Sequence, residues 1–148
     1  MKILITGITG FLGSQLAEYQ LSKGNLVIGT KRKSSNLERC KTFLENVTWI
    51  NLDDENWRQI IINYDPQVFI NAAWSGVGAV DRNNWQVQLK NIDFTLALLE
   101  IAKELKVEKF IGLGTQAEYG LFSGNIDENH PVRPSSAYGL AKQLTSLL

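Results

Sequence analysis

Two residues near the end of the chain, Tyr138 and Lys142, have the side chains and the spacing that proton transfer needs. If the segment is helical, a separation of four residues places both side chains on one face of the helix. A tyrosine phenol has a reference pKa of about 10, and a nearby ammonium group favours the phenolate and lowers that pKa. The pair therefore predicts an acid/base that works near neutral pH, although the same spacing also occurs on ordinary helix surfaces.

The N-terminal segment predicts a turn that binds phosphate. A short apolar run at residues 2–5 predicts a buried strand, and a helical pattern follows the glycine-containing segment Thr6-Gly7-Ile8-Thr9-Gly10-Phe11-Leu12-Gly13. Gly7 allows the tight turn, Gly10 lets the backbone approach a pyrophosphate, and Gly13 lets helix and strand pack closely. The free N–H groups at the start of the helix would bind the anion. This spacing is a variant of the dinucleotide-binding fingerprint, and it favours a nucleotide site over a plain glycine-rich turn.

Composition limits the classes of protein to which the chain can belong. A chain of 148 residues, 44% hydrophobic and 20% charged, is typical of one globular domain with a substantial core. The 15 basic and 15 acidic residues cancel, so we expect neither nucleic acid nor a membrane as a partner. A single cysteine, Cys40, and the lack of a leader or a long apolar span predict a cytoplasmic protein. Cys40 itself is expected to be a helix residue without function.

Apolar strand patterns alternate with helical patterns along the chain. We expect strands near residues 2–6, 25–29, 47–50, 67–71 and 109–113, and helices near 11–23, 37–45, 55–63, 85–105 and 136–148. This alternation predicts an α/β fold, a doubly wound parallel sheet of the Rossmann-like type that is covered on both faces. In such a sheet, ligands bind beyond the carboxyl ends of the strands, where the long loops near 72–84 and 115–135 begin.

Six motifs follow one another along the chain. They are Thr6-Gly7-x-x-Gly10-Phe11-Leu12-Gly13, Asn71-Ala72-Ala73, Asn91, Gly114-Thr115-Gln116-Ala117-Glu118-Tyr119-Gly120, Glu128-x-x-Pro131-x-x-Pro134 and Tyr138-x-x-x-Lys142. Together they resemble the extended short-chain dehydrogenase/reductases, the group of nucleotide-sugar epimerases, dehydratases and reductases, over the whole chain. The resemblance implies an NAD(P)-dependent enzyme that acts on a nucleotide-sugar, by 4-keto-sugar reduction or by 4-epimerisation.

The resemblance also implies roles for individual residues. Tyr138 would be the catalytic acid/base, Lys142 would hold the nicotinamide ribose and favour the phenolate, and the Thr115 hydroxyl would bind the reacting sugar oxygen. Asn91 matches a helix asparagine that supports the structure and a proton-relay water, but a buried, hydrogen-bonded asparagine is an equal alternative. The implied cofactor contacts come from Gly7, Thr9, Gly10, Phe11, Leu12, Gly13, Lys31, Arg32, Asn51, Leu52, Ala72, Ala73, Asn91, Tyr138 and Lys142.

The segment after the second strand bears on the choice of cofactor. Enzymes that use NAD commonly place an acidic residue there to bind the ribose 2′-hydroxyl, whereas a basic residue accommodates a 2′-phosphate. Here Lys31 stands about where the acid would be, Arg32 follows it, and no acid is in reach. Arginine and serine side chains suit phosphate, so the segment favours NADP over NAD, with a solvated basic turn as the alternative.

The end of the third strand should hold the adenine. Asn51 occupies the position where the resembling family usually has an aspartate that accepts a hydrogen bond from the adenine amine, and Leu52 follows it. An asparagine carbonyl can accept the same bond. The nearby Asp53 or Asp54 is the alternative acceptor.

The residues after Thr115 bear on the type of reaction. The 4,6-dehydratases of the resembling family carry Asp and Glu directly after the catalytic threonine, whereas this chain has Gln116 and Ala117. An amide and a methyl group cannot exchange protons at neutral pH, which argues against a dehydratase of that type. Glu118 comes one position too late and is expected to point elsewhere. An NADP preference would fit a reductase, because epimerases normally retain NAD.

The resembling family continues beyond Leu148 with another strand and a C-terminal lobe that binds the nucleotide-sugar. We therefore expect residues 1–148 to be an incomplete NAD(P)-binding domain, either a fragment or a natural truncation, which can be inactive by itself. The resemblance also implies a homodimer, formed through the helices near 85–105 and 136–148. A non-catalytic NAD(P)-binding sensor on the same fold is the alternative function, although the retained Tyr138 and Lys142 favour an enzyme.

Two further groups of side chains have simpler interpretations. His130 is expected in a surface loop, and the absence of a second histidine or a cysteine cluster predicts no metal site. Trp74 and Trp85 flank the loop after the fourth strand. Either could line a substrate cleft, but packing in the core or in a lid is the favoured interpretation.

Overall fold

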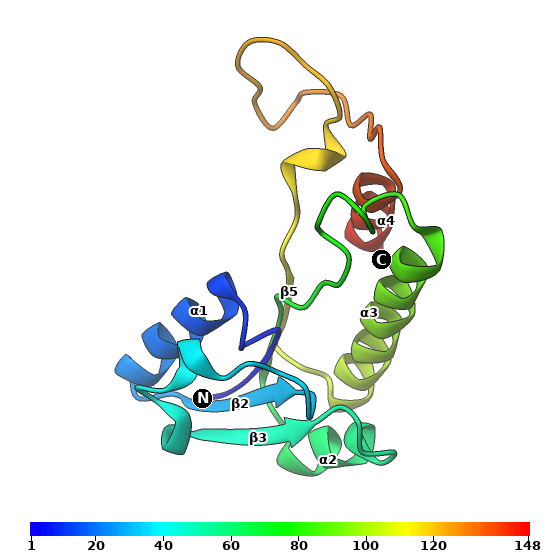
Figure 1. The fold of residues 1–148 in the computed structure, drawn as a ribbon. Coiled ribbons are helices and arrows are strands. Elements are labelled where there is room, and N and C mark those ends of the chain that lie inside the picture. The colour runs from blue at the N-terminus through cyan, green and yellow to red at the C-terminus, as the bar shows by residue number, and fades with distance from the viewer. The chain divides into compact units, whose positions relative to one another are not determined.

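Five strands form one sheet in the order β3-β2-β1-β4-β5 (Figure 1). The computed structural model describes residues 1–148, which divide into two compact units, residues 1–73 with 98–111 and residues 74–97 with 112–148. The strands are β1 (Lys2–Thr6), β2 (Leu26–Lys31), β3 (Val47–Asn51), β4 (Val68–Asn71) and β5 (Lys109–Gly112). Parallel pairing joins β1 to β2 and β4, and β2 to β3. The predicted doubly wound sheet is confirmed, and every predicted strand is present.

The strand order fixes where a ligand can bind. From β1 the chain continues outward to β2 and β3, and it then returns to β4 on the other side of β1. Open α/β sheets bind ligands at such a reversal, beyond the carboxyl ends of the strands. The glycine turn of residues 7–10 directly follows β1 at this reversal point.

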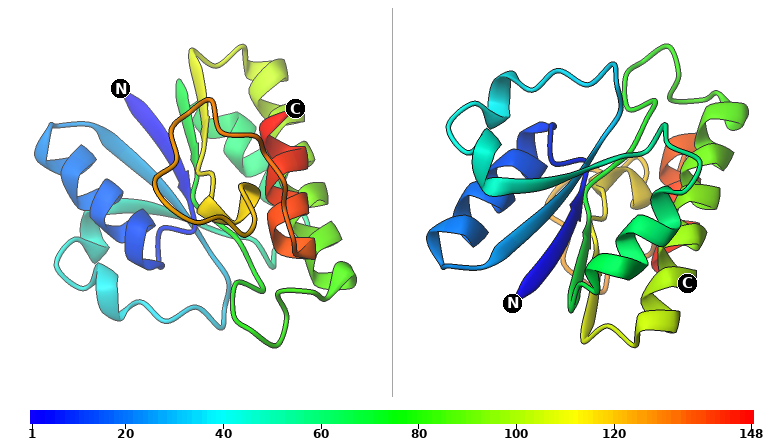
Figure 2. Two further views of the ribbon diagram at one scale, coloured as in Figure 1. Left: turned by 90° about the horizontal axis from the view of Figure 1, so that it is seen from above. Right: turned by 90° about the horizontal axis from the view of Figure 1, so that it is seen from below.

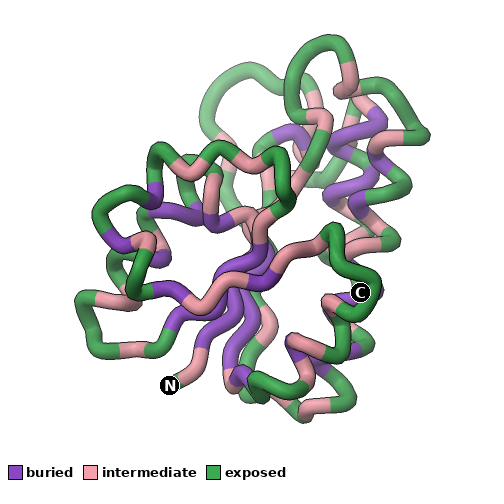
Figure 3. The backbone as a smooth tube through the Cα atoms, turned by 60° about the horizontal axis from the view of Figure 1, so that its bottom comes forward, coloured by how far each residue is buried: buried purple, intermediate pink, exposed green.

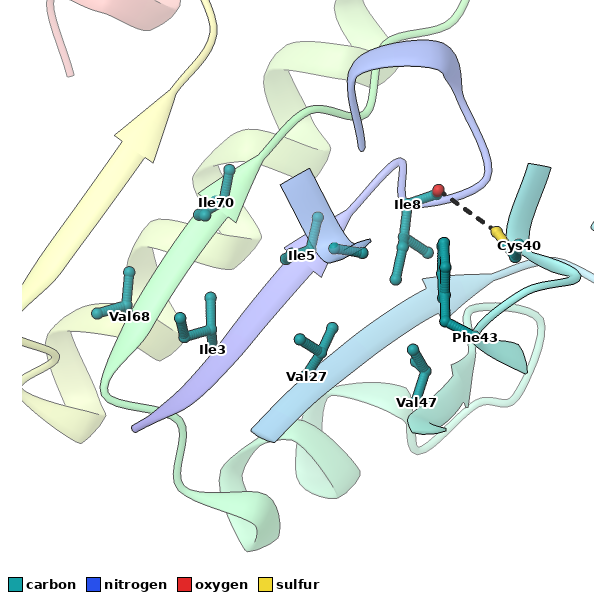
Figure 4. Close-up of a cluster of buried hydrophobic side chains, with 10 residues drawn as sticks. Ile3, Ile5, Ile8, Val27, Cys40, Phe43, Val47, Val68 and Ile70 are labelled. Carbon is teal, nitrogen blue, oxygen red and sulfur yellow. Dashed lines mark hydrogen bonds between the residues drawn. The ribbon is translucent and has the colours of Figure 1, made fainter. Parts of the chain in front are cut away.

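Alternate strand residues build the core on one face of the sheet. Buried residues follow the strands along the backbone (Figure 3). The helix α1 (Phe11–Ser22) covers one face, and α2 (Trp57–Tyr64) lies on the opposite side (Figure 2). The cluster beside α1 consists of Ile3, Ile5, Ile8, Ala17, Val27, Cys40, Phe43, Val47, Val68 and Ile70 (Figure 4).

The helix predicted over residues 37–45 is wrong. Two short 3-10 turns, Glu38–Cys40 and Leu44–Asn46, replace it. Backbone bonds run from Cys40 to Leu37, from Phe43 to Cys40 and from Asn46 to Phe43, so the chain repeats every three residues here. Cys40 and Phe43, which are one such repeat apart, both lie in the core cluster.

Cys40 is therefore a buried residue of a 3-10 turn. Its Sγ donates to the Ile8 carbonyl oxygen at 3.6 Å, as Figure 4 shows, and burial raises the pKa of the thiol. A thiol held in its protonated form is a poor nucleophile, which agrees with a packing role.

The second unit contains the first half of α3 (Trp85–Leu105), the 3-10 turn η3 (Gln116–Glu118) and α4 (Ala137–Ser146). The predicted helices 11–23, 55–63, 85–105 and 136–148 are present, with ends shifted by at most two residues. The turn η3 was not predicted. None of the helices combines the length and the apolar character that crossing a membrane requires.

Candidate dinucleotide and catalytic sites

The glycine turn between β1 and α1 has the geometry of a phosphate cradle. Gly7 has a φ of +66°, and a Cβ there would lie 2.5 Å from the Ala72 oxygen, so only glycine fits. A Cβ at Gly13 would collide with the Gly7 carbonyl oxygen. Gly10 begins α1, and no side chain caps that helix end. The first N–H groups of α1, at Phe11, Leu12 and Gly13, are therefore placed to bind an anion.

The carboxyl ends of β1 and β4 are tied together beside this turn. The buried Thr6 hydroxyl donates to the Asn71 side-chain oxygen at 2.6 Å, and the Ala72 amide donates to the Thr6 carbonyl at 3.2 Å. The backbone of Ala72 and Ala73 thus lies against Gly7. The sequence-predicted cofactor residues of the first and fourth strand ends are brought together by the fold.

The turns after β2 and β3 form a second cluster. Arg32 donates its amide to the Ser35 hydroxyl at 2.9 Å, and Lys33 donates its amide to an Asp53 carboxylate oxygen at 2.6 Å. The expectation that no acid lies in reach of this segment is therefore wrong, because the turn after β3 brings Asp53 to it. This contact depends on the pairing of β2 with β3, so the residues after β2 could not predict it by themselves. Lys31 ends β2, opposite Asn51 in register.

Asn51 and its neighbours hold the end of β3. The Asn51 side-chain oxygen accepts from the Asp53 amide at 3.2 Å, and its nitrogen donates to Asp54 at 3.2 Å. The Leu52 amide donates to the Lys31 carbonyl at 2.8 Å. A carbonyl oxygen has two lone pairs, so Asn51 keeps one for a further donor. The predicted adenine contact of Asn51 stays a prediction.

These features fit a dinucleotide on four counts. There is a cradle that a Cβ would fill, a helix N-terminus without a side-chain cap, a turn with basic residues after β2, and a buried polar atom without a partner, the Thr30 hydroxyl near the end of β2.

Tyr138 and Lys142 lie on the buried face of α4. Each of the two residues is 9% exposed. The first three backbone N–H groups of α4 each donate to an acceptor outside the helical ladder. The Ala137 amide donates to the Asn83 side-chain oxygen at 3.1 Å, and the Tyr138 amide donates to the Arg82 carbonyl at 2.9 Å. The Gly139 amide donates to the Ser136 hydroxyl at 3.1 Å. The start of the helix is thus fixed by the loop 78–84 and by its own cap.

Lys142 is held by an oxygen and an aromatic ring. Its Nζ donates to the Leu113 carbonyl at 2.7 Å and lies 4.0 Å from the centre of the Trp74 ring. Burial lowers the pKa of the Lys142 ammonium to about 8, and the Glu118 carboxylate opposes part of this shift. Lys142 therefore remains largely protonated at neutral pH, as an electrostatic role requires.

Thr115 begins the turn η3 with a capping box. Its Oγ1 accepts from the Ala117 amide at 3.3 Å, while a Glu118 carboxylate oxygen accepts from the Thr115 amide at 2.7 Å. Because Oγ1 acts as an acceptor here, the hydroxyl proton remains available to a ligand. Glu118, which was expected to point elsewhere, turns back onto Thr115, and the capping pattern of Thr115 and Glu118 could have predicted this.

Asn91 is a buried, hydrogen-bonded residue. Its oxygen accepts from the Ser75 amide at 2.9 Å, and its nitrogen donates to the Ser75 carbonyl at 2.9 Å and to the Val87 carbonyl at 3.2 Å. Asn91 thus matches one of the two alternatives that the sequence left open, a buried and hydrogen-bonded asparagine. A cofactor contact of Asn91 stays a prediction.

Sequence reasoning missed Gln88, which is fully buried on the same helix. Its oxygen accepts from the Trp74 indole at 2.9 Å, and its nitrogen donates to the Gly76 and Asp81 carbonyls at 3.0 and 3.1 Å. A second amide three residues before Asn91 was the available signal. Gln88 and Asn91 together fix the loop that follows Ala73.

The two tryptophans of this loop differ. Trp74 is packed: its ring meets the Tyr138 ring edge-on, with centroids 6.1 Å apart. Trp85 is half-exposed and lines a cavity of about 420 Å³ together with Asn83, Pro134, Ser135, Ser136, Ala137 and Leu140. A place for either tryptophan in a substrate cleft stays a prediction.

His130 packs edge-on against the rings of Tyr119 and Phe122, with centroids 6.0 and 5.9 Å apart. No group of three or more histidine, cysteine or acidic side chains gathers in a way that could hold a metal ion.

Comparison with known proteins places the chain in a family. The model of the NAD dependent epimerase/dehydratase family matches residues 3–148. The uncharacterized UDP-glucose epimerase YtcB of Bacillus subtilis is 32% identical over 96% of this chain and 48% of its own length. The crystal structure of UDP-glucose 4-epimerase from Thermotoga maritima, with UDP-glucose, superposes with a TM-score of 0.86 at 27% identity, over 99% of this chain and 49% of that one.

A second similar structure contains the cofactor. The Y149F mutant of UDP-glucuronic acid 4-epimerase from Bacillus cereus, in complex with NAD, has a TM-score of 0.83 at 27% identity, over 99% of this chain and 50% of that one. The chain spans about half the length of the relatives that it matches. It belongs to the NAD-dependent epimerase/dehydratase family.

Proposed function

We propose that this chain carries the dinucleotide-binding and acid/base parts of an NAD(P)-dependent enzyme that reduces or epimerises a nucleotide-sugar at C4. One observation carries the proposal. A Cβ at Gly139 would collide with the Ala117 carbonyl oxygen, so α4, with Tyr138 and Lys142, packs directly on the turn that begins at Thr115. Three side chains suited to proton exchange, charge and hydrogen bonding thus belong to one packed unit.

Each of these residues has a distinct task in the proposed reaction. When bound, the nicotinamide supplies or accepts a hydride. Tyr138 donates a proton to the sugar ketone oxygen in reduction and takes it back from the alcohol in oxidation. The Thr115 hydroxyl donates a hydrogen bond to the same oxygen, and the Lys142 ammonium stabilises negative charge on the phenol oxygen and binds the ribose.

The turns after β2 and β3 support NADP as the cofactor. Arg32 takes part in neither of the two salt bridges of the structure, so its guanidinium is available to a 2′-phosphate. Asp53 already accepts the Lys33 amide, and this bond holds the turn that presents Arg32. NAD is the alternative, with Asp53 as the acceptor of the ribose 2′-hydroxyl.

The proposal is tested with a protein that also supplies the half of its relatives' length that this chain does not span. Consumption of NADPH and NADH is measured with a panel of nucleotide-linked 4-keto sugars, and C4 inversion is measured with UDP-glucose. Tyr138→Phe should lower turnover by about 10²–10⁴-fold, because it removes the transferable proton, while cofactor affinity is preserved.

Thr115→Ser serves as the matched control because it keeps the hydroxyl, and it should retain activity. Near wild-type turnover of Tyr138→Phe would rule out Tyr138 as the acid/base. The chain would then be better described as a nucleotide-binding sensor.

A further inference from the structure

Arg82 lies against the tyrosine that we propose as the acid/base. Its guanidinium carbon is 4.9 Å from the centre of the Tyr138 ring. The Trp74 ring meets the same tyrosine ring at an interplanar angle of 78°, edge-on. Tyr138 is therefore in contact with a cation and with an aromatic ring, both supplied by the loop that follows Ala73. Sequence analysis singled out neither contact.

The backbone holds Arg82 in this position. Its carbonyl accepts from the Tyr138 amide at 2.9 Å, and its amide donates to the Gly78 carbonyl at 3.0 Å. The neighbouring Asp81 carbonyl accepts from the buried Gln88 side chain at 3.1 Å. The loop is thus bonded to α4 at Arg82 and to α3 at Asp81, and the guanidinium is placed over the ring without a hydrogen bond of its own.

Arg82 forms no salt bridge with an acidic residue. The two salt bridges of the structure join Lys41 to Glu38 and Arg58 to Glu100. A cation over an aromatic face is attracted by the ring electrons, and the attraction grows when the ring gains negative charge.

We propose that Arg82 is a positioning residue of the acid/base site, which fixes the Tyr138 ring and stabilises its phenolate from the ring face. Lys142 is the other cation of the site, on α4 itself, and Glu118 is the acidic residue that acts on Lys142. Lys142 is bound to the Leu113 carbonyl and lies over the Trp74 ring, whereas Arg82 lies over the Tyr138 ring itself. The inference rests on Tyr138 as the acid/base of the proposed function.

The test needs neither cofactor nor substrate. The chain has four tyrosines, so the ultraviolet absorbance of tyrosinate is followed against pH in the wild type and in Tyr138→Phe, and the difference reports Tyr138 alone. In Arg82→Met the Tyr138 transition should move to higher pH, because the variant removes a cation from the face of the ring. Arg82→Lys, which keeps a cation, should lie between the two.

Arg58→Met is the matched control. Arg58 also lies over an aromatic ring, that of Trp57, at 5.5 Å, but it does not contact Tyr138. It should leave the Tyr138 transition unchanged. The bonds that fix the loop use only the main chain of Arg82, so Arg82→Met and Arg82→Gln should keep the wild-type circular dichroism and melting temperature. A Tyr138 transition at the wild-type pH in either folded variant would overturn the inference.

An activity measurement separates this inference from the proposed function. In the longer protein, Arg82→Met should lower kcat at neutral pH by about tenfold with little change in the KM for the sugar, and Arg82→Lys should restore part of the rate. Absence of turnover in the wild type with every sugar tested would contradict the proposed function, while the absorbance shift would still support the contact between Arg82 and Tyr138. A kcat unchanged in Arg82→Met would overturn the catalytic part of the inference.

Discussion

At the residue scale, the catalytic candidates owe their properties to burial. Lys142 is a cation with little access to water, and its compensation comes from one carbonyl oxygen and one indole ring. Such partners offset only part of the cost of burial, which is why the pKa of Lys142 falls to about 8. The Thr115 hydroxyl keeps a group for a ligand. Its oxygen already accepts from the Ala117 amide, and its proton is available as a donor.

The lowered pKa of Lys142 predicts a dependence of stability on pH. The unfolded lysine titrates near pH 10.5 and the folded one near 8, so between these values the unfolded state binds more protons. The free energy of unfolding contributed by this residue therefore rises from about pH 8 to 10.5 and is constant below pH 8. Thermal melts should show that the stability of the wild type rises relative to that of Lys142→Met from about pH 8 to 10.5. A difference that does not change with pH would contradict the assignment.

At the element scale, loops and turns carry most of the site. Only the elements whose residue spacing is visible within one segment could be predicted from the sequence. The glycine turn, α1 and α4 follow from spacing within one segment, and the structure has them where the sequence predicted them. The residues 37–45 formed 3-10 turns because Cys40 and Phe43 pack on the sheet, which is a tertiary effect. Asp53 and Arg82 reach their partners across sequence separations of 20 and 56 residues, and no local pattern encodes such contacts.

The loop after Ala73 should depend on Gln88. Gln88→Leu removes an acceptor from the Trp74 indole and a donor from two carbonyls, which are partly buried partners of a fully buried side chain. Leaving buried polar groups unpaired costs about 1–3 kcal/mol each, so the free energy of unfolding should fall by at least ~2 kcal/mol. Urea denaturation measures it. Gln86→Leu, at an exposed position of the same helix, is the control and should change little. Equal stability of the two variants would mean that the amide network is dispensable.

The turns after β2 and β3 should determine cofactor preference. Arg32→Ala should weaken NADP binding by roughly 1.5–3 kcal/mol, about tenfold or more, and leave NAD binding nearly unchanged, because it removes a charged donor to the 2′-phosphate. Asp53→Asn keeps an acceptor for the Lys33 amide but loses the negative charge, so it should tighten NADP binding. Fluorescence titration of both reduced cofactors measures these affinities. Weaker NAD binding in Asp53→Asn would instead identify Asp53 as the acceptor of the ribose hydroxyl.

At the scale of the whole molecule, the chain has a dinucleotide cradle in one compact unit and the acid/base residues in the other. The order of the strands places every predicted cofactor turn at the carboxyl ends, as the general rule for open α/β sheets requires. The chain matches its family along nearly all its residues but spans about half the length of its relatives. The turns at the strand ends and the acid/base residues of α4 are the parts of the proposed active site that lie in this chain.

Exposed apolar residues on two helices predict self-association. On α3, Trp85, Leu89 and Leu96 are 45, 50 and 39% exposed, and their spacing places them on one face. Leu140 and Leu144 of α4 are 38 and 43% exposed, one turn apart. We propose that these faces pair in a homodimer, since apolar stripes of this kind gain stability when they are covered.

Sedimentation equilibrium should then show a dimer of the wild-type chain, which Leu89→Asp converts to monomer because a carboxylate cannot be buried without a partner. Lys90→Asp, at an exposed position off this face, introduces the same side chain and should remain dimeric. The far-ultraviolet circular dichroism of both variants should match the wild type, which excludes unfolding as the cause. If the wild type is monomeric throughout the concentration range, or if Lys90→Asp dissociates as readily as Leu89→Asp, the exposed leucines of α3 are not the interface.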